Sequence, residues 1–415
     1  MLNVEDIDLT EWAFWERPFA ERNEGFRLLR EHGSPRHFRE LPAGFGDPGP
    51  GYRALVTYAD VVEASRRPQD FCSGQGAISI PDMPTEVNEY FGSMISMDDP
   101  RHAKIRRIVS RAFSPRMIQR FEDQVETVAE LIVDDLRAGK GTGDFVLDVS
   151  CRLPLKIICD MMGIPESAYQ DVLDSSNVIL AGNDPEYLPS NDFEGIMLKL
   201  AAAGETLQNL VQDLSRERKG KDGDDLISLL INANIDGESL TPQELGSFFI
   251  LLAVAGNETT RNAISHGLHL FTQHPEQRAL LLSDYEAHAP GAIEEIVRFV
   301  SPVIWMRRTA TRDTTLNDHE IKAGEKLVLY YGSANRDATV FTDPDEFDIA
   351  RSPNPHIGFG GPGPHFCLGA HLARREVNVM FRRLFAAFPE IRSGEPDRLF
   401  SNFINGIKHL PYTLS

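Results

Sequence analysis

The stretch from His356 to Arg374 reads HIGFGGPGPHFCLGAHLAR and decides how this chain folds. Four glycines and two prolines fall between Gly358 and Pro364, and this composition fits neither a helix nor a regular strand. Apolar residues at helical spacing follow directly after Cys367. The segment therefore predicts a tight loop that delivers Cys367 to the N-terminus of a helix.

Two interpretations of Cys367 follow from this position. Unpaired backbone N–H groups and the positive end of the helix dipole favour a thiolate, which is a nucleophile or a metal ligand. A lone cysteine is more often a buried, unreactive core residue. The unreactive alternative does not explain the glycines, including Gly369 behind the cysteine. They indicate a backbone packed closely against something flat or bulky.

A second region predicts one long helix from Thr241 to Phe271. The segment TPQE at 241–244 is a capping box with proline at the first helical position, and His274-Pro275 ends the apolar run. Such a helix is about 45 Å long, enough to cross a domain. Its middle, AGNETT at 255–260, is unusual because glycine and an unpaired acid are both costly inside a buried helix. A kink with a satisfied polar pair is one explanation, and a functional site is the other.

The remaining pattern predicts a mainly helical protein with small β-sheets, folded as a single domain over residues 1–415. The segment from Met117 to Gly139 predicts a helix whose apolar face holds Ile118, Phe121, Val125, Val128, Leu131, Ile132 and Leu136. Strand-like segments are fewer and shorter: Tyr52 to Tyr58, Thr309 to Tyr331, and about the last twenty residues. No internal repeat or linker separates two cores.

Composition excludes several classes of protein. The 41% hydrophobic and 25% charged residues are typical of a globular chain, and a net charge of −20 argues against a general nucleic-acid binder. The longest apolar stretch, 248–256, is too short to span a membrane, and the acidic N-terminus lacks the apolar core of a signal peptide. Four cysteines without a Cys-x-x-Cys pair argue against a disulfide scaffold or a zinc module. We therefore expect a soluble, cytoplasmic protein.

The segment from Phe359 to Gly369 resembles the haem-binding loop of the cytochrome P450 superfamily. The resemblance implies the cytochrome P450 fold and makes Cys367 the axial ligand of a haem iron. Thiolate ligation favours cleavage of the O–O bond. The resemblance also implies that Phe359, Gly360 and Gly369 border the haem. Phe359 lies one residue farther from Cys367 than in most members, a difference that some bacterial lipid and steroid hydroxylases share.

Two further segments match in the expected order. The segment 255–260 resembles the family's oxygen-activation motif, in which an acid–alcohol pair, here Glu258 and Thr259, relays protons. In this motif Gly256 opens space for dioxygen. The segment from Glu295 to Arg298 resembles the family's Glu-x-x-Arg helix, whose expected partner here is Arg351. A buried ion network of this kind is structural and holds the cysteine loop in place.

Four basic side chains complete the resemblance. His102 and Arg106 are four residues apart and share one helix face. In the family this face contacts a haem propionate, and Arg308 and His365 match two other propionate contacts. Each side chain taken alone could be a solvated cation. Because two propionates require paired cations, the four residues and the cysteine loop together imply a site for haem b.

The resemblance further implies a monooxygenase that uses O₂ and two electrons derived from NAD(P)H. Residues 101–116 carry six basic residues and no acid, and the helix after the cysteine adds Arg374, Arg375, Arg382 and Arg383. Both segments lie near the cysteine face of the haem in the family fold. This placement suits docking of an acidic ferredoxin, itself served by a ferredoxin reductase. Nucleic-acid binding is the alternative for 101–116, and the lack of interleaved aromatic residues argues against it.

Segments expected on the substrate side are rich in Ile, Met, Phe and Val. They are 77–94, 178–188, 248–256, 303–306 and 401–407. The residues expected to contact substrate are Ile80, Met94, Ala255, Val303, Ile304 and Phe403. An apolar pocket with few polar groups implies a lipid-like substrate, whereas many of these residues could equally be core.

A finer resemblance narrows the substrate. Residues 98–113, 255–274 and 401–408 and the longer cysteine loop are similar to bacterial hydroxylases of methyl-branched lipids and related steroid side-chain hydroxylases. This subgroup implies oxidation of the terminal (ω) carbon of a methyl-branched fatty acid, isoprenoid or related lipid. One alternative is the same chemistry on a steroid or secondary metabolite. The other is a non-catalytic haem protein, which would not need the acid–alcohol pair.

Overall fold

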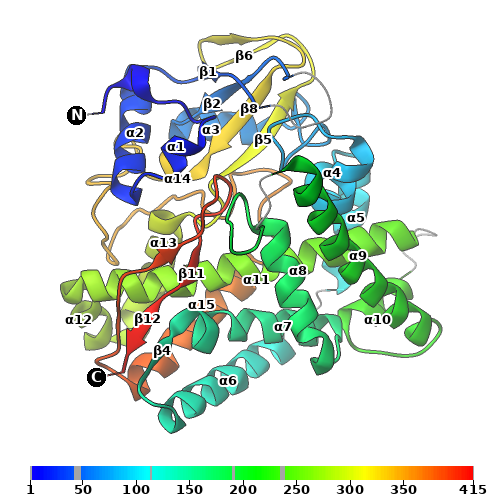
Figure 1. Cartoon of the computed structure of the whole chain (residues 1–415), viewed down its shortest axis with the longest axis vertical. Coiled ribbons are helices and arrows are strands. Elements are labelled where there is room, and N and C mark those ends of the chain that lie inside the picture. Colours follow the sequence, from blue (N-terminus) through cyan, green and yellow to red (C-terminus); the bar gives the residue numbers. More distant parts are fainter. Residues whose placement is uncertain (1, 42–47, 113–114, 189–191, 234–238, 415) are drawn as a thin grey trace.

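A computed structural model describes residues 2–41, 48–112, 115–188, 192–233 and 239–414, without the side chains of residues 111–118 and 120. Figure 1 shows the larger β-sheet and the N-terminal helices in one half of the molecule. Most other helices surround the long helix α11 (Pro242–Gln273), which crosses the middle of the view. The predicted architecture, mainly helical with small sheets, is confirmed.

The helices follow one another along most of the chain. In order, they are η1 (Val4–Asp6), α1 (Trp12–Trp15), α2 (Phe19–His32), α3 (Tyr58–Arg66), α4 (Thr85–Gly92), η2 (Ser93–Ser96), α5 (Arg101–Ala112), α6 (Pro115–Ala138), η3 (Val146–Ser150), α7 (Arg152–Met162), η4 (Glu166–Ala168), α8 (Tyr169–Leu180), α9 (Phe193–Arg218), α10 (Leu226–Ile231), α11, α12 (Pro275–Ser283), α13 (Tyr285–Val300), α14 (Tyr331–Ala334) and α15 (Ala370–Ala387).

Within the residues that the structure describes, the strands form four small sheets. They are β1 (Arg36–Phe38), β2 (Tyr52–Leu55), β3 (Phe71–Cys72), β4 (Thr142–Asp144), β5 (Trp305–Ala310), β6 (Thr314–Leu316), β7 (His319–Ile321), β8 (Lys326–Tyr330), β9 (Arg392–Ser393), β10 (Asp397–Arg398), β11 (Ile407–His409) and β12 (Pro411–Thr413). The largest sheet has the order β1-β2-β8-β5-β3, in which β2 and β8 are parallel and the other pairs antiparallel. The others are β4-β12-β9, β6-β7 and β10-β11.

The predicted start of the central helix is confirmed in detail. The Thr241 side chain accepts a hydrogen bond from the Glu244 backbone, and the Glu244 carboxylate accepts one from the Thr241 backbone. Proline follows Thr241 at the first helical position, where its missing N–H costs no hydrogen bond. Helix α11 stays helical through residues 255–260 and packs against α4, α7, α8, α9, α13 and α15. It therefore connects both sides of the site described below.

Helix α6 carries the predicted amphipathic pattern with one exception. Phe121, Val125, Val128 and Ile132 are buried against neighbouring helices, whereas Leu131 is 53% exposed. The prediction for Leu131 is wrong because it lies at the edge of the stripe formed by residues spaced three and four apart. The Ile118 side chain lies outside the described residues. Among the helices described, none combines the length and apolar character that crossing a bilayer requires.

Candidate active site

The cysteine loop is held by short backbone hydrogen bonds and by close packing. The Cys367 N–H donates to the Phe359 carbonyl at 3.0 Å, and Gly369 forms the N-cap of α15. A Cβ on Gly361 would lie 2.5 Å from Ser65 Oγ of α3, so glycine is needed there. The predicted close packing thus occurs against protein at this position. Gly369 differs, since a Cβ there would meet no heavy atom within 4 Å.

The protonation of Cys367 depends on opposing effects. The side chain is exposed, yet the protein around it desolvates the sulfur and raises the pKa of the thiol. The backbone N–H groups of Gly369 and Ala370 and the charges of Arg106 and Arg374 lower the pKa in part. The helix terminus therefore acts in the predicted direction without outweighing burial. A metal ion bound at the sulfur would hold it as a thiolate.

The four predicted anion contacts converge beside this loop. The rings of His102 and His365 lie 4.3 Å apart between centroids, and Arg106 Nη2 donates to the Phe366 carbonyl at 2.8 Å. Arg308 is buried, and its Nη1 donates to the Arg307 carbonyl at 2.7 Å. Helix α5 places His102 and Arg106 on one face, as their spacing predicts.

The cluster is electropositive and incompletely satisfied. Burial, with the charges of Arg308, His102 and Arg106, lowers the pKa of His365 to about 2. Burial also lowers the pKa of His102, whose Nε2 is buried and has no hydrogen-bond partner among the described residues. Anionic groups placed here would compensate these charges. A haem fits this donor set, because the Cys367 sulfur could hold iron while the cluster holds two propionates.

The acid–alcohol pair of α11 lies in two different environments. Thr259 is partly exposed, and its Oγ1 donates to the Ala255 carbonyl at 3.0 Å. Glu258 is 1% exposed; its Oε1 accepts from Arg261 and, at 3.1 Å, from Asn262 Nδ2. The second carboxylate oxygen of Glu258 is buried and finds no hydrogen-bond partner in the described part of the chain. Helix α11 thus holds a buried ion pair in which, among the described residues, one carboxylate oxygen has no hydrogen-bond partner.

Two neighbours of this pair refine the sequence prediction. Asn257 is completely buried, and both of its amide atoms lack a hydrogen-bond partner among the described residues. A Cβ on Gly256 would lie 2.9 Å from Ile158 Cδ1 of α7. This contact gives the glycine a packing reason, and the expectation that Gly256 opens space for dioxygen stays a prediction. The glycine allows α7 and α11 to approach each other.

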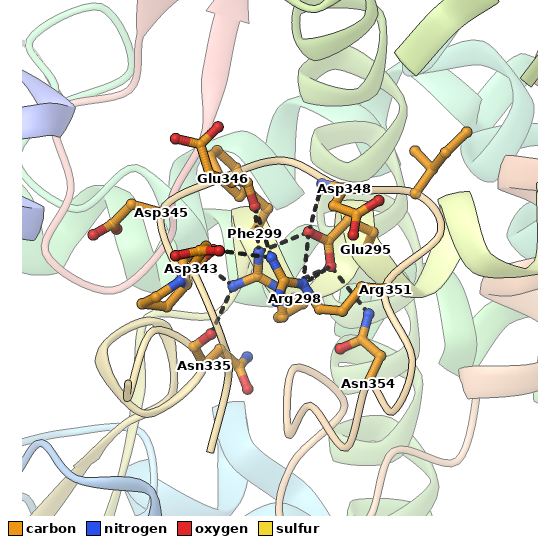
Figure 2. A network of polar contacts seen from close by, with 12 residues as sticks. Glu295, Arg298, Phe299, Asn335, Asp343, Asp345, Glu346, Asp348, Arg351 and Asn354 are labelled. Carbon is orange, nitrogen blue, oxygen red and sulfur yellow. Dashed lines mark hydrogen bonds and ion pairs between the residues drawn. The ribbon is translucent and has the colours of Figure 1, made fainter. Parts of the chain in front are cut away.

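The predicted Glu295–Arg298–Arg351 network is present and fully buried at its centre (Figure 2). Arg298 donates two hydrogen bonds to the Glu295 carboxylate, at 2.8 and 2.7 Å, and others to the carbonyls of Asn335, Pro344 and Glu346. Arg351 Nε lies 3.2 Å from both carboxylate oxygens. Asn354 Nδ2, which the sequence did not single out, donates to Glu295 at 3.1 Å.

The sequence analysis missed a second polar network, which is centred on Glu294, the residue before Glu295. Glu294 accepts from Arg374 of α15 and is 2.7 Å from His356 Nε2, at the start of the cysteine loop. Burial would raise the pKa of Glu294, but His356 and Arg374 prevail and lower it to about 2. The Arg374 guanidinium also lies 4.3 Å from the centre of the Phe359 ring. This network ties α13 and α15 directly to the cysteine loop.

The substrate side contains a cavity of about 280 Å³. Its lining is apolar apart from Ser79 and Asn402, and it includes two predicted contacts, Ile80 and Phe403. Four of the five predicted segments have residues in the lining: Ile78, Ser79, Ile80 and Pro81; Val178, Ile179, Leu180, Gly182 and Leu188; Trp305; Asn402 and Phe403. Ile196 and Leu200 of α9 complete it, and only their helical spacing hinted at this role.

The other predicted substrate contacts lie elsewhere. Met94 is 5% exposed in the core beneath α11, and Ile304 is 8% exposed in the core of the N-terminal half. Val303 forms an isolated β-bridge with Ile404, next to Phe403. Ala255 is exposed on α11 but does not line this cavity. Burial in the two cores explains why Met94 and Ile304 are not in this lining.

The predicted basic surface is partly neutralised. Arg375, Arg382 and Arg383 of α15 all pair with Glu126 of α6, and Arg374 pairs with Glu294. In α5, Arg101 lies 2.6 Å from Glu89. The sequence shows the run of cations but not the acids that fold against it. The side chains of Arg111 and Arg116 lie outside the described residues.

Comparisons with known proteins agree with this geometry. The cytochrome P450 family model matches residues 79–285 and 289–403. A methyl-branched lipid ω-hydroxylase of Mycobacterium tuberculosis (strain H37Rv) is 47% identical, over 99% of this chain and 95% of that protein. A steroid C26-monooxygenase of Mycolicibacterium smegmatis is 42% identical, over 90% of this chain and 86% of that protein.

Comparison with solved structures also finds cytochrome P450 proteins. Mycobacterium marinum cytochrome P450 CYP268A2 in complex with pseudoionone has a TM-score of 0.92 and 40% identity, covering 100% of this chain and 99% of that chain. Bacillus megaterium CYP109E1 in complex with corticosterone has a TM-score of 0.78 and 28% identity, covering 97% and 99%. Because family model, relatives and folds agree over most of its length, the chain belongs to the cytochrome P450 family of haem-dependent monooxygenases, which use O₂ and electrons from redox partners.

Proposed function

We propose that this protein hydroxylates the terminal (ω) carbon of a methyl-branched fatty acid, isoprenoid or related lipid. The observation that carries the proposal is the 47% identity to a methyl-branched lipid ω-hydroxylase over nearly the whole chain. The apolar lining of the 280 Å³ cavity supports it, since only Ser79 and Asn402 contribute polar side chains. The protein would act as one cytochrome P450 domain over residues 1–415.

The haem, which we propose to be haem b, supplies activation of O₂ and transfer of one oxygen atom to a C–H bond. In our proposal, the Cys367 thiolate holds the iron. His102, Arg106, Arg308 and His365 hold the two propionates, as their convergence and incomplete hydrogen bonding suggest. Phe359, Gly360 and Gly369 border the ring; Gly369 has room on its free side.

We assign Glu258 and Thr259 to proton delivery. Arg261 and Asn262 hold one oxygen of the Glu258 carboxylate, while the other oxygen, Oε2, has no hydrogen-bond partner among the described residues and stays available for the relay. Thr259 Oγ1 donates a hydrogen bond to the Ala255 carbonyl, and the residue is partly exposed, so its hydroxyl remains accessible for the relay.

Selection of a terminal carbon requires positional control, because secondary C–H bonds are intrinsically weaker. A narrow apolar cavity can deliver one end of a chain while its walls hold the remainder. We therefore place the lipid chain along Ile80, Trp305 and Phe403. Electrons would come from NAD(P)H through a ferredoxin reductase and a ferredoxin. Both carriers are cytoplasmic molecules, and we propose the same location for this enzyme.

A second candidate substrate is the side chain of a steroid. The 42% identity to a steroid C26-monooxygenase favours it, and the chemistry at a terminal methyl group would be the same. The two candidate substrates differ in the width of the molecule that the cavity must hold. A panel of branched fatty acids, isoprenoids and steroids distinguishes them by the shift of ferric iron toward high spin and by mass spectrometry of the alcohol formed.

The first experiment is the spectrum of the reduced protein with carbon monoxide. The strongly red-shifted band of a thiolate-ligated haem is expected, and Cys367→Ser should remove it. An ordinary haem–CO band in the fully loaded wild-type protein would contradict ligation by Cys367. A spin shift with a polar polyketide, and with none of the lipids or steroids, would overturn the proposed substrate class.

A further inference from the structure

Three guanidinium groups surround the ring of Phe19, the first residue of α2. The Cζ atoms of Arg22, Arg336 and Arg398 lie 5.6, 5.5 and 5.4 Å from the centre of this ring. Arg22 belongs to α2, Arg336 follows α14, and Arg398 belongs to β10. We call these three residues the Phe19 arginine cluster, and it joins three distant parts of the chain.

Only one member of the cluster has an acidic partner. Arg336 donates to Asp345 Oδ1 at 2.9 Å and to the Phe299 carbonyl at 3.0 Å. Within the described part of the chain, the side chains of Arg22 and Arg398 form no hydrogen bond and no ion pair. Arg22 is 9% exposed with a partnerless Nε, and Arg398 Nη1 is likewise buried and partnerless. The Phe19 ring attracts the cations but does not replace oxygen acceptors for these N–H groups.

The surroundings leave this positive charge uncompensated. Burial and the charge of Arg398 lower the pKa of Arg22 to about 10. Burial lowers the pKa of Arg398, and Glu395, an exposed residue, opposes this only in part. The charge of Arg398 adds to burial in lowering the pKa values of His266 and His269 on α11. The neighbouring titratable groups thus respond to excess positive charge.

Buried cations without a counter-charge are costly, and two like charges near one ring increase the cost. Guanidinium groups offer planar pairs of N–H donors that match the oxygens of phosphate or carboxylate. We propose that a small oxyanion binds between Arg22 and Arg398 beside Phe19. Arg398 is only partly buried, which gives an anion access from solvent. Nothing in the monooxygenase reaction uses these residues.

The position of the site gives the oxyanion a structural effect. Arg398 pairs with Ile407 across the β10–β11 hairpin, and the loop of this hairpin carries Phe403 into the lining of the cavity. An anion bound by Arg22 and Arg398 holds the base of the hairpin against α2. Binding to the folded state alone raises its stability with anion concentration.

The first test is equilibrium dialysis of the haem-loaded protein against labelled inorganic phosphate, with chloride replaced at constant ionic strength. One phosphate per chain is expected, and the variants Arg22→Met and Arg398→Met should each weaken binding at least about tenfold. Arg392→Met is the matched control, because Arg392 is exposed on β9, the strand that precedes β10 in sequence. This variant should bind phosphate as tightly as the wild-type protein. Acetate as competitor distinguishes a phosphate-specific site from one that also takes a carboxylate.

The second test is thermal unfolding, which does not depend on catalysis. About 50 mM phosphate should raise the midpoint of the wild-type protein by about 2 °C or more, and should leave both cluster variants unchanged. In chloride alone, the variants should be no less stable than the wild-type protein, because each removes an uncompensated buried charge. This reversal of the order of stability would not arise from a purely structural role of the arginines.

Two outcomes would overturn the proposal. Equal phosphate binding or equal stabilisation in the wild-type protein, both cluster variants and Arg392→Met would mean an adventitious ion only. No binding to the wild-type protein at about 50 mM phosphate or acetate would mean that solvent and the Phe19 ring suffice for the two cations. If one arginine variant fails to fold, the other variant and the wild-type dialysis still decide the question.

Discussion

The cysteine side and the α11 side of the site differ in how completely their buried polar groups are hydrogen-bonded. On the cysteine side, the carboxylates of Glu294 and Glu295 are each engaged by at least two donors. On the side of α11, Glu258 leaves one oxygen without a partner, and Asn257 leaves both amide atoms without one among the described residues. The two carboxylates that anchor the cysteine loop are therefore engaged on both oxygens, whereas Glu258 of α11 is engaged on one oxygen only among the described residues.

This contrast has a physical basis. A fully hydrogen-bonded network resists displacement, because removing one partner leaves a buried charge unpaired. A buried group with an open position can accept or release a proton or a water molecule without first breaking a bond. We infer that the cysteine side is rigid and that the α11 side transfers protons. The predictions below test each half of this contrast.

The largest effect is expected from Glu295→Gln on the cysteine side. The change keeps the shape of the side chain but leaves Arg298, which is completely buried, without its counter-charge. We expect a loss of about 3–5 kcal/mol in the free energy of unfolding and weaker retention of haem. Denaturant unfolding measures the loss. Glu286→Gln, exposed on the same helix, is the control, and a loss no larger than in this control would contradict a rigid cysteine side.

The next effect is expected from Glu258→Gln on the α11 side. Glutamine keeps the hydrogen bonds to Arg261 and Asn262 but cannot deliver a proton. We expect kcat to fall about 100-fold, and stability to fall as well, because Arg261 is buried and loses its counter-charge. Thr259→Ala should lower the yield of hydroxylated product per NAD(P)H oxidised, whereas Thr260→Ala on the buried face should not. Full coupling in Thr259→Ala would remove Thr259 from proton delivery.

A smaller effect is expected from the pH dependence of Glu294. Its pKa is about 2 in the folded protein against an ordinary value of 4.5, so its contribution is complete above about pH 4.5 and is lost as the pH falls toward 2. Because the carboxylate is partly exposed, we expect about 1–2 kcal/mol. The stability difference between wild type and Glu294→Gln should be constant near pH 7 and shrink below pH 4.5. A difference that stays constant down to pH 3 would contradict this linkage.

The smallest effect is expected in the cavity. Phe403 lines it and makes an edge-to-face contact with Trp305, with the ring centroids 4.9 Å apart. Phe403→Ala should weaken binding of a branched lipid about fivefold, or about 1 kcal/mol, with kcat nearly unchanged. The spin-state titration of the ferric protein measures this change. Phe400→Ala is the control, because Phe400 packs on Trp12 outside the cavity lining; an equal loss there would argue against a direct contact.

Much of the site followed from short segments of sequence. The loop before Cys367, the cap at Thr241 and the shared face of His102 and Arg106 depend on residues within a few positions of one another. Backbone geometry and helical periodicity determine such features locally. The spacing of Glu295 and Arg298 is too short a pattern to be informative alone. It became informative together with its position between α11 and the cysteine loop.

Only the tertiary structure decided which distant groups meet. Glu294 pairs with Arg374, 80 residues away, and Glu126 pairs with Arg375, 249 residues away, so the charge pattern of α15 alone overstated its free positive charge. Gly256 approaches Ile158 of another helix, a contact that the sequence around the glycine does not indicate. By itself, the sequence determined the helices, the cysteine loop and the candidate ligands, because near neighbours along the chain control caps and periodicity. The partners of the buried charges depend on which faces dock, and no local pattern records that choice.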